Sequence, residues 1–176
     1  SGLVAGTKST EQASATGRFV IECFDKDGKL KWAAEEHNLV VNVGLQYLAG
    51  CGLTSTTQIT TWYIGLYGAG ASNTPAASDT LSSHAGWTEI TPYSGNRPSV
   101  TFAAATNANP SVVTNSASKA QFTMNATATV GGAFLCSAAS GTTGTLFSAA
   151  DFSSPGDRSV VSGDVLSVGY TFSLSA

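Results

Sequence analysis

The segment Gln121–Val130 alternates strictly between polar and apolar residues, and this alternation constrains the fold more than any other feature. A strand places successive side chains on opposite faces, so the segment predicts a strand with one buried face. The same pattern returns at Val165–Ala176. There the expected core face consists of Leu166, Val168, Tyr170, Phe172 and Leu174. Two long alternating segments predict an antiparallel all-β domain. We expect its core to include Phe122, Met124, Tyr170 and Phe172.

Turn residues divide the remaining chain into shorter elements. Arg18–His37 predicts a hairpin that turns at Asp25–Gly28, where Gly28 adopts a left-handed conformation. Gly131-Gly132 predicts a second hairpin turn, directly after the alternating strand, since paired glycines supply the positive φ values of tight turns. The short apolar run Trp62–Gly68 predicts a strand buried on both faces.

One short helix is expected after the first hairpin. Asn42 is its predicted N-cap, Leu45 and Leu48 are its predicted core contacts, and Gly50 and Gly52 are expected to end it. With about seven or eight strands, the chain predicts a single antiparallel β-sandwich over residues 18–176, of jelly-roll type. Two long connections, at 68–96 and 141–157, are expected to be functional or held by partners.

Residues 1–17 predict an extended arm. Apart from Leu3 and Val4 this segment has almost nothing to bury, so it should be ordered only where something holds it. A neighbouring subunit is the simplest holder; contact with the chain's own domain is the alternative. We expect Leu3, Val4 and Lys8 to contact a partner, together with Trp87 in the first long connection.

Charge is scarce. Only 11% of the residues are charged, against about a quarter in ordinary soluble domains. A polar but uncharged surface suits packing against other protein copies, and an extracellular-type sandwich with a Ser/Thr surface is the alternative.

The net charge of −3 and the lack of a basic stripe argue against nucleic acid as a partner. No apolar run is long enough to cross a bilayer. The three cysteines, Cys23, Cys51 and Cys136, lack metal-type spacing, and we expect Cys23 and Cys136 to be reduced.

No residue pattern predicts catalysis, a cofactor or a metal site. Asp79, Ser82 and His84 share one connection but lack a nucleophile motif, and we interpret them as loop residues that form hydrogen bonds. Glu35 and Glu36 are adjacent, so on a strand they face opposite sides. The tryptophans and tyrosines leave two interpretations open. They fill a core or a subunit interface, which we favour, or they form a carbohydrate-binding platform.

Several segments together resemble small virion proteins of tailed bacteriophages. They are 37–50 (HNLVVNVGLQYLAG), 62–68 (WYIGLYG), 84–93 (HAGWTEITPY), 118–135 (SKAQFTMNATATVGGAFL) and 144–172. The resemblance implies a structural, non-enzymatic protein, with capsid decoration (cement) proteins of jelly-roll-like fold as the nearest type. It implies the major capsid protein and copies of the chain itself as partners, in a dimer or trimer. It also implies a place on the capsid exterior after synthesis in the bacterial cytoplasm. Attachment to a tail or fibre is the alternative.

Overall fold

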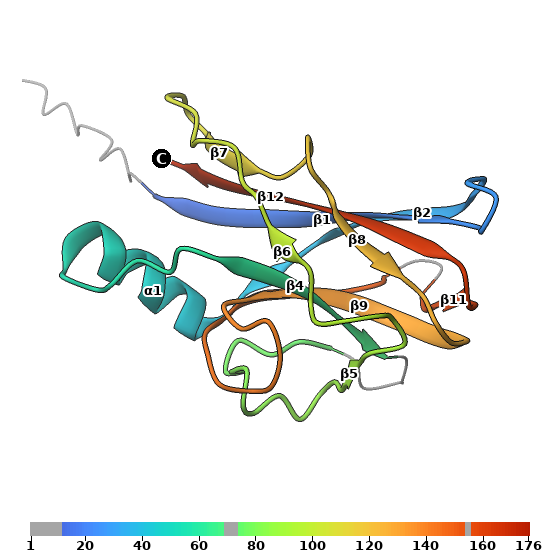
Figure 1. The fold of residues 1–176 in the computed structure, drawn as a ribbon. Helices are drawn as coiled ribbons and strands as arrows, with labels where there is room; N and C mark the ends of the chain where they lie inside the picture. The colour runs from blue at the N-terminus through green and yellow to red at the C-terminus, as the bar shows by residue number, and fades with distance from the viewer. Residues whose placement is uncertain (1–11, 69–73, 154–155) are drawn as a thin grey trace, which may run out of the picture.

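The computed structural model describes residues 12–68, 74–153 and 156–176, which form two antiparallel sheets packed in a sandwich-like arrangement (Figure 1). The predicted all-β class with one short helix is confirmed. The described residues contain twelve strands, more than the seven or eight expected, because several are only two to four residues long. The jelly-roll topology stays a prediction.

The first sheet is built on the chain's two longest strands. Strands β1 and β12 pair in continuous register, from Ser14 opposite Ser175 to Phe24 opposite Val165. The strand order is β2-β1-β12-β7, and β8 also pairs with β12. The strands of this sheet are β1 (Ser14–Phe24), β2 (Leu30–His37), β7 (Ser111–Thr114), β8 (Ala120–Thr123) and β12 (Val165–Ser175). The β1–β2 hairpin and the positive φ of Gly28 are both confirmed.

The second sheet has the order β3-β10-β9-β4-β5, with β11 paired to β9 and β6 paired to β4. Its strands are β3 (Leu39–Val40), β4 (Trp62–Gly68), β5 (Glu89–Ile90), β6 (Ser99–Val100), β9 (Ala128–Cys136), β10 (Leu146–Asp151) and β11 (Arg158–Val160). In Figure 1 the first sheet forms the upper layer, and the second sheet with the helix α1 forms the lower one.

The main core lies between the two sheets. Phe122, Met124 and Tyr170 are each 1% exposed and Phe172 is 8% exposed, which confirms the predicted core face. The exception is Leu174, expected in the same row, which is 44% exposed. It lies near the end of β12, where the strand runs beyond the packed core.

A second cluster covers the outer face of the second sheet. Residues of the first long connection, Leu81 and Trp87, pack there against Tyr67 and Phe134. This explains why β4 is buried on both faces, as predicted. The described part of the connection, from Thr74 onward, is therefore held by its own domain, and no partner is needed to position it.

The hairpin predicted at Gly131-Gly132 is wrong. Both glycines lie inside β9, and neither has a positive φ. A Cβ on Gly132 would lie 2.2 Å from the ring of Tyr67 and 2.2 Å from the carbonyl oxygen of Ala150. The glycine is needed for this close approach, since any side chain would displace Tyr67. The single strand predicted over Gln121–Val130 is also wrong, because β8 ends at Thr123 in the first sheet and β9 begins at Ala128 in the second.

The helix also differs from its prediction. Helix α1 spans Asn42–Leu53, so it begins at Asn42 with Val41 as its N-cap, and it continues through Gly50 and Gly52. Leu48 packs against the core as expected, whereas Leu45 is 44% exposed. No helix in the described part of the chain has the length and apolar character needed to span a membrane.

The boundary predicted for the arm is wrong by a few residues. The arm was expected to end at Gly17, yet Ser14–Gly17 already form the start of β1 and pair with Phe172–Ser175. Backbone pairing with β12 holds this stretch, although it carries little apolar surface. Leu3, Val4 and Lys8 lie outside the described residues.

Candidate functional site

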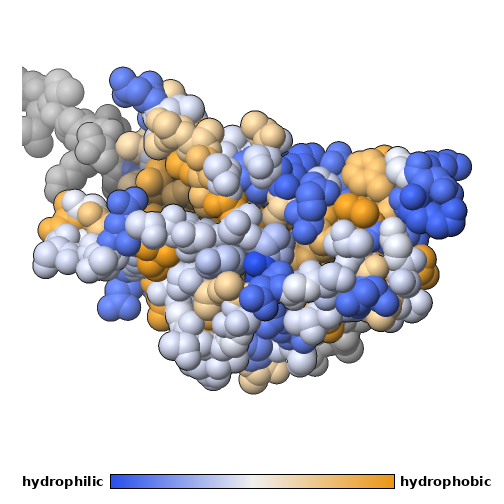
Figure 2. All heavy atoms as spheres, viewed as in Figure 1, coloured by the Kyte–Doolittle hydropathy of each residue, from blue (hydrophilic) through white to orange (hydrophobic). Residues whose placement is uncertain are grey.

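An open groove of about 800 Å³ lies between the two sheets, on the side where α1 and β7 meet the sandwich. It is lined by α1 and the loop after it, by residues of β4, β9 and β10, by the segment from β6 to Ala105, and by β7 and the C-terminal half of β12. Figure 2 shows apolar side chains gathered in a recess between the upper and lower layers on this side.

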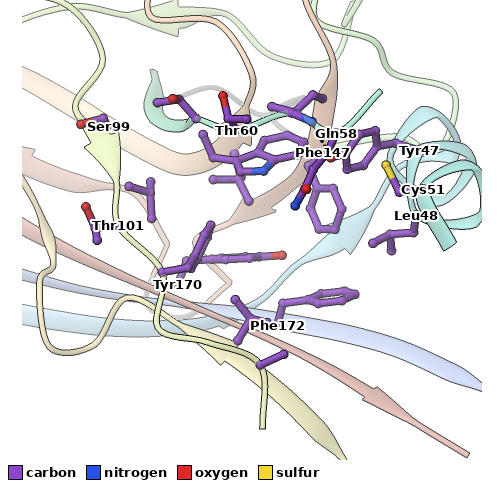
Figure 3. A pocket seen from close by; sticks show the side chains of 18 of the residues that line it. Tyr47, Leu48, Cys51, Gln58, Thr60, Ser99, Thr101, Phe147, Tyr170 and Phe172 are labelled. Atoms are coloured by element: carbon purple, nitrogen blue, oxygen red, sulfur yellow. Dashed lines mark hydrogen bonds between the residues drawn. The ribbon is translucent and has the colours of Figure 1, made fainter. Parts of the chain in front are cut away.

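A continuous series of aromatic rings crosses the groove from α1 to β12. Tyr47 meets Trp62 with ring centroids 5.4 Å apart, Trp62 meets Phe147 at 5.4 Å, and Phe147 meets Phe172 at 5.3 Å. All three contacts are edge-to-face, the arrangement that the ring quadrupoles favour. The series joins both sheets, so it forms a rigid floor. Figure 3 shows this arrangement, with Tyr47, Leu48 and Cys51 on the helix and Tyr170 and Phe172 on β12.

A glycine lets α1 approach the groove closely. A Cβ on Gly44 would lie 2.3 Å from the carbonyl oxygen of Phe147, and the same oxygen accepts a hydrogen bond from the Val41 amide at 3.1 Å. The helix therefore rests directly on the backbone of β10, which brings Tyr47 over the groove. The Tyr47 hydroxyl accepts a hydrogen bond from the Ile59 amide at 2.8 Å and thereby fixes the loop after α1. Burial raises the pKa of the Tyr47 phenol above its ordinary value.

The lining carries no charged side chain. Its exposed rim consists of hydroxyl and amide groups, from Gln58, Thr60, Thr61, Ser99 and Thr101. Tyr170 closes the inner end, where its buried hydroxyl accepts hydrogen bonds from Asn38 at 2.8 Å and Ser148 at 3.1 Å. Such a lining excludes a charged ligand by desolvation and favours an uncharged, apolar segment whose polar edges meet the rim.

Trp87 does not occupy the surface position expected of a partner contact. Its side chain is 3% exposed, its indole nitrogen donates to Asp79 at 3.0 Å, and its ring stacks on His84 at 3.8 Å. The ring therefore serves the core under the long connection, and we give it no part in the proposals below. The predictions for Leu3, Val4 and Lys8 concern residues that the structure does not describe.

The candidate acid–base residues are engaged in structural contacts. His84 and Asp79 bond within their own connection, as interpreted from the sequence. Glu35 and Glu36 face opposite sides of β2: Glu35 pairs with Arg18 at 2.5 Å on the surface, while buried Glu36 accepts hydrogen bonds from Ser153. Within the described residues, no group of three or more His, Cys, Asp or Glu side chains is placed to hold a metal ion.

The groove was not predicted from the sequence. The four rings of its edge-to-face series come from four separate elements, so no local spacing reveals them. The available signal was weaker: aromatic residues were expected in a core or a subunit interface, and Tyr47 and Trp62 are half-buried at the edge of the core. Comparisons of the chain with family models, curated proteins and solved structures give no match. The resemblance to phage virion proteins therefore stays a prediction.

Proposed function

We propose that this chain is a non-enzymatic bacteriophage virion structural protein, a head decoration (cement) protein that binds the outside of the capsid lattice. The observation that carries the proposal is the uncharged aromatic groove, open between the sheets and formed by rings from four elements. A rigid apolar recess of this kind is suited to anchoring a protein segment, since buried aromatic contacts dominate protein interfaces. The resemblance stated above supplies the capsid as the partner.

The low charge of the chain supports the same function. A lattice protein contacts several neighbours at once, and each charge in those contacts would have to lose its water. A surface rich in Ser, Thr and Ala avoids this cost. Many weak contacts repeated by symmetry then give strong attachment, because each contact raises the effective concentration of the next.

The test is binding to undecorated capsids of the phage that encodes the chain. We expect the purified protein to co-sediment with them at a fixed ratio and to raise their resistance to heat.

Thr101→Lys adds a charge to the exposed rim of the groove without changing the core, and it should weaken binding to the capsids. Thr142→Lys adds the same charge to an exposed loop outside the groove and serves as the control. Equal capsid binding by the two variants would remove the groove from the contact, and no binding by the unaltered chain would refute head decoration. Binding to tails or fibres instead would favour the alternative attachment role.

A carbohydrate-binding module is the second candidate. The half-buried Tyr47 and Trp62 lie beside the hydroxyl and amide rim of the groove, and aromatic faces next to hydrogen-bonding groups suit sugar rings. This function predicts specific signals on a glycan array from the isolated protein. It also predicts that those signals disappear in Trp62→Ala while capsid affinity is absent throughout.

A further inference from the structure

The groove leaves apolar surface open to water at the very place where the described chain begins. Leu174 lines the groove and is 44% exposed, and the neighbouring Trp62, Phe102 and Val113 are only partly buried. An exposed apolar recess of this size on a small domain usually marks an interaction site. The question is which segment covers it.

The beginning of β1 places one segment of this chain beside the groove. Ser14 pairs with Ser175, and Ala15 pairs with Leu174, which is itself a groove residue. The described chain therefore begins within a few residues of the rim of the groove, and residues 1–11 precede that point in the sequence.

The chemistry of that segment matches the groove. Its only large apolar side chains are adjacent, at Leu3 and Val4, and small residues flank them in the run Ser1–Thr7. Small neighbours let a backbone enter a narrow recess, while two branched apolar side chains meet the aromatic floor. The first seven residues carry no charged side chain, in agreement with the uncharged lining.

The direction of β1 favours the groove of another copy. From Ser14, eleven residues lead back to Leu3, and an extended chain of that length spans roughly 36 Å. Entry into the groove of the same copy would need a sharp reversal close to Ser14. The stretch Lys8–Ala13 contains neither glycine nor proline, the residues that most favour such a reversal. An N-terminal segment without such a reversal would reach a neighbouring copy instead.

We propose that the groove of one copy holds Leu3 and Val4 of a second copy, so that exchanged N-terminal segments join the chains into a homo-oligomer. The exchange occurs between copies in solution and needs no capsid. A groove filled in this way is not open to a capsid segment, so it would serve capsid decoration by joining neighbouring copies. The cross-linking test below needs no capsid, so its failure and the failure of capsid decoration are distinguishable.

The chain carries a natural reporter for this contact, because Cys51 lines the groove and is partly exposed, whereas Cys23 and Cys136 are buried. A donor chain, Leu3→Cys/Cys51→Ser, is mixed with unaltered acceptor chain and oxidised with copper phenanthroline. We expect a disulfide-linked heterodimer on non-reducing electrophoresis, with Cys51 identified in the cross-linked peptide by mass spectrometry.

Two controls make the result decisive. A donor with its cysteine elsewhere, Thr142→Cys/Cys51→Ser, measures cross-linking by random collision and should react on the order of tenfold more slowly, because docking raises the effective concentration of the thiol. The single variant Leu3→Cys, with Cys51 intact, detects contact within one chain. A fast-migrating, internally cross-linked monomer would overturn exchange between copies. Cross-linking of the two donors at the same rate would overturn docking of this segment altogether.

Discussion

Replacing Arg97 should destabilise the fold strongly, because its side chain is buried and bonded to several groups. The Arg97 side chain is 2% exposed, and its guanidinium forms a two-pronged pair with Glu89, at 2.7 Å and 2.6 Å. It also donates to the carbonyl oxygens of Ala138 and Gly141, each at 2.8 Å, and lies 5.2 Å from the ring centroid of Phe134. One side chain thus fastens the loop after β9 to the strand β5.

The expected magnitude follows from what Arg97→Ala leaves behind. Breaking a buried ion pair by removing one partner costs about 3–5 kcal/mol, since the remaining charge is buried and unpaired. Glu89 retains 24% exposure of its side chain, so water reaches it and the lower end, about 3 kcal/mol, applies. Arg97→Lys keeps the charge but not the planar fork, and should cost about half as much.

The assay is urea unfolding followed by tryptophan fluorescence, with unchanged m-values as the sign that two-state behaviour holds. Arg18→Ala is the matched control, because the Arg18–Glu35 pair has the same chemistry but side chains about half exposed. Its loss should cost less than about 1 kcal/mol. Equal losses for Arg97→Ala and Arg18→Ala would refute the argument that burial makes the Arg97 contact strong.

Three further predictions concern packing and protonation. In the same unfolding assay, Gly132→Ala should lower the free energy of unfolding by about 1–3 kcal/mol, because its Cβ would overlap a ring and a backbone oxygen. Gly52→Ala lies in open space within α1 and should raise the free energy of unfolding by up to about 1 kcal/mol. The opposite order of the two variants would contradict the packing. Burial raises the pKa of Cys23 to about 11 and that of Tyr93 to about 12, above their ordinary values of 9.0 and 10.0, so folded chains hold these protons more tightly than unfolded ones. Their contribution to stability is complete below pH 9 and is lost as the pH rises, so the melting temperature should fall from pH 9 to 11, and less steeply in Cys23→Ala. In the folded protein at pH 8, a thiol reagent should modify Cys51 alone, and rapid labelling of Cys23 would show that its burial is wrong.

Strand β12 is predicted correctly, because its alternating residues form one buried face up to Phe172. The equally regular alternation at Gln121–Val130 does not form one strand, since β8 ends at Thr123 in the first sheet and β9 begins at Ala128 in the second. Alternation therefore indicates which side chains are buried, but it does not show that a segment stays in one sheet. The error at Gly131-Gly132 has a physical cause: a glycine pair is compatible with a turn and with close packing, and only the position of Tyr67 distinguishes the two. Similarly, Gly50 and Gly52 lower helix propensity without preventing α1, since tertiary contacts support the helix.

The candidate site is less predictable than the strands. Its aromatic rings are separated by up to 125 positions along the chain, from Tyr47 to Phe172, and become neighbours only through the pairing of distant strands. Trp87 shows the opposite case. A tryptophan in a long polar connection suggests a partner contact, yet the ring is buried by its own domain because the connection folds onto the outer face of β4. Sequence alone does not separate an aromatic side chain at an interface from one that covers a sheet.

The measurement that tests the proposed function most directly is a cryo-electron microscopy reconstruction of the phage virion to which we assign this chain. We predict density for the two-layered sandwich on the outer surface of the capsid, in repeated copies. The aromatic groove of each copy should be filled by a peptide segment rather than open to solvent. Density for this fold in the tail or fibres, or virions that lack the chain, would contradict head decoration. Capsid-bound copies with empty grooves would contradict the role assigned to the groove.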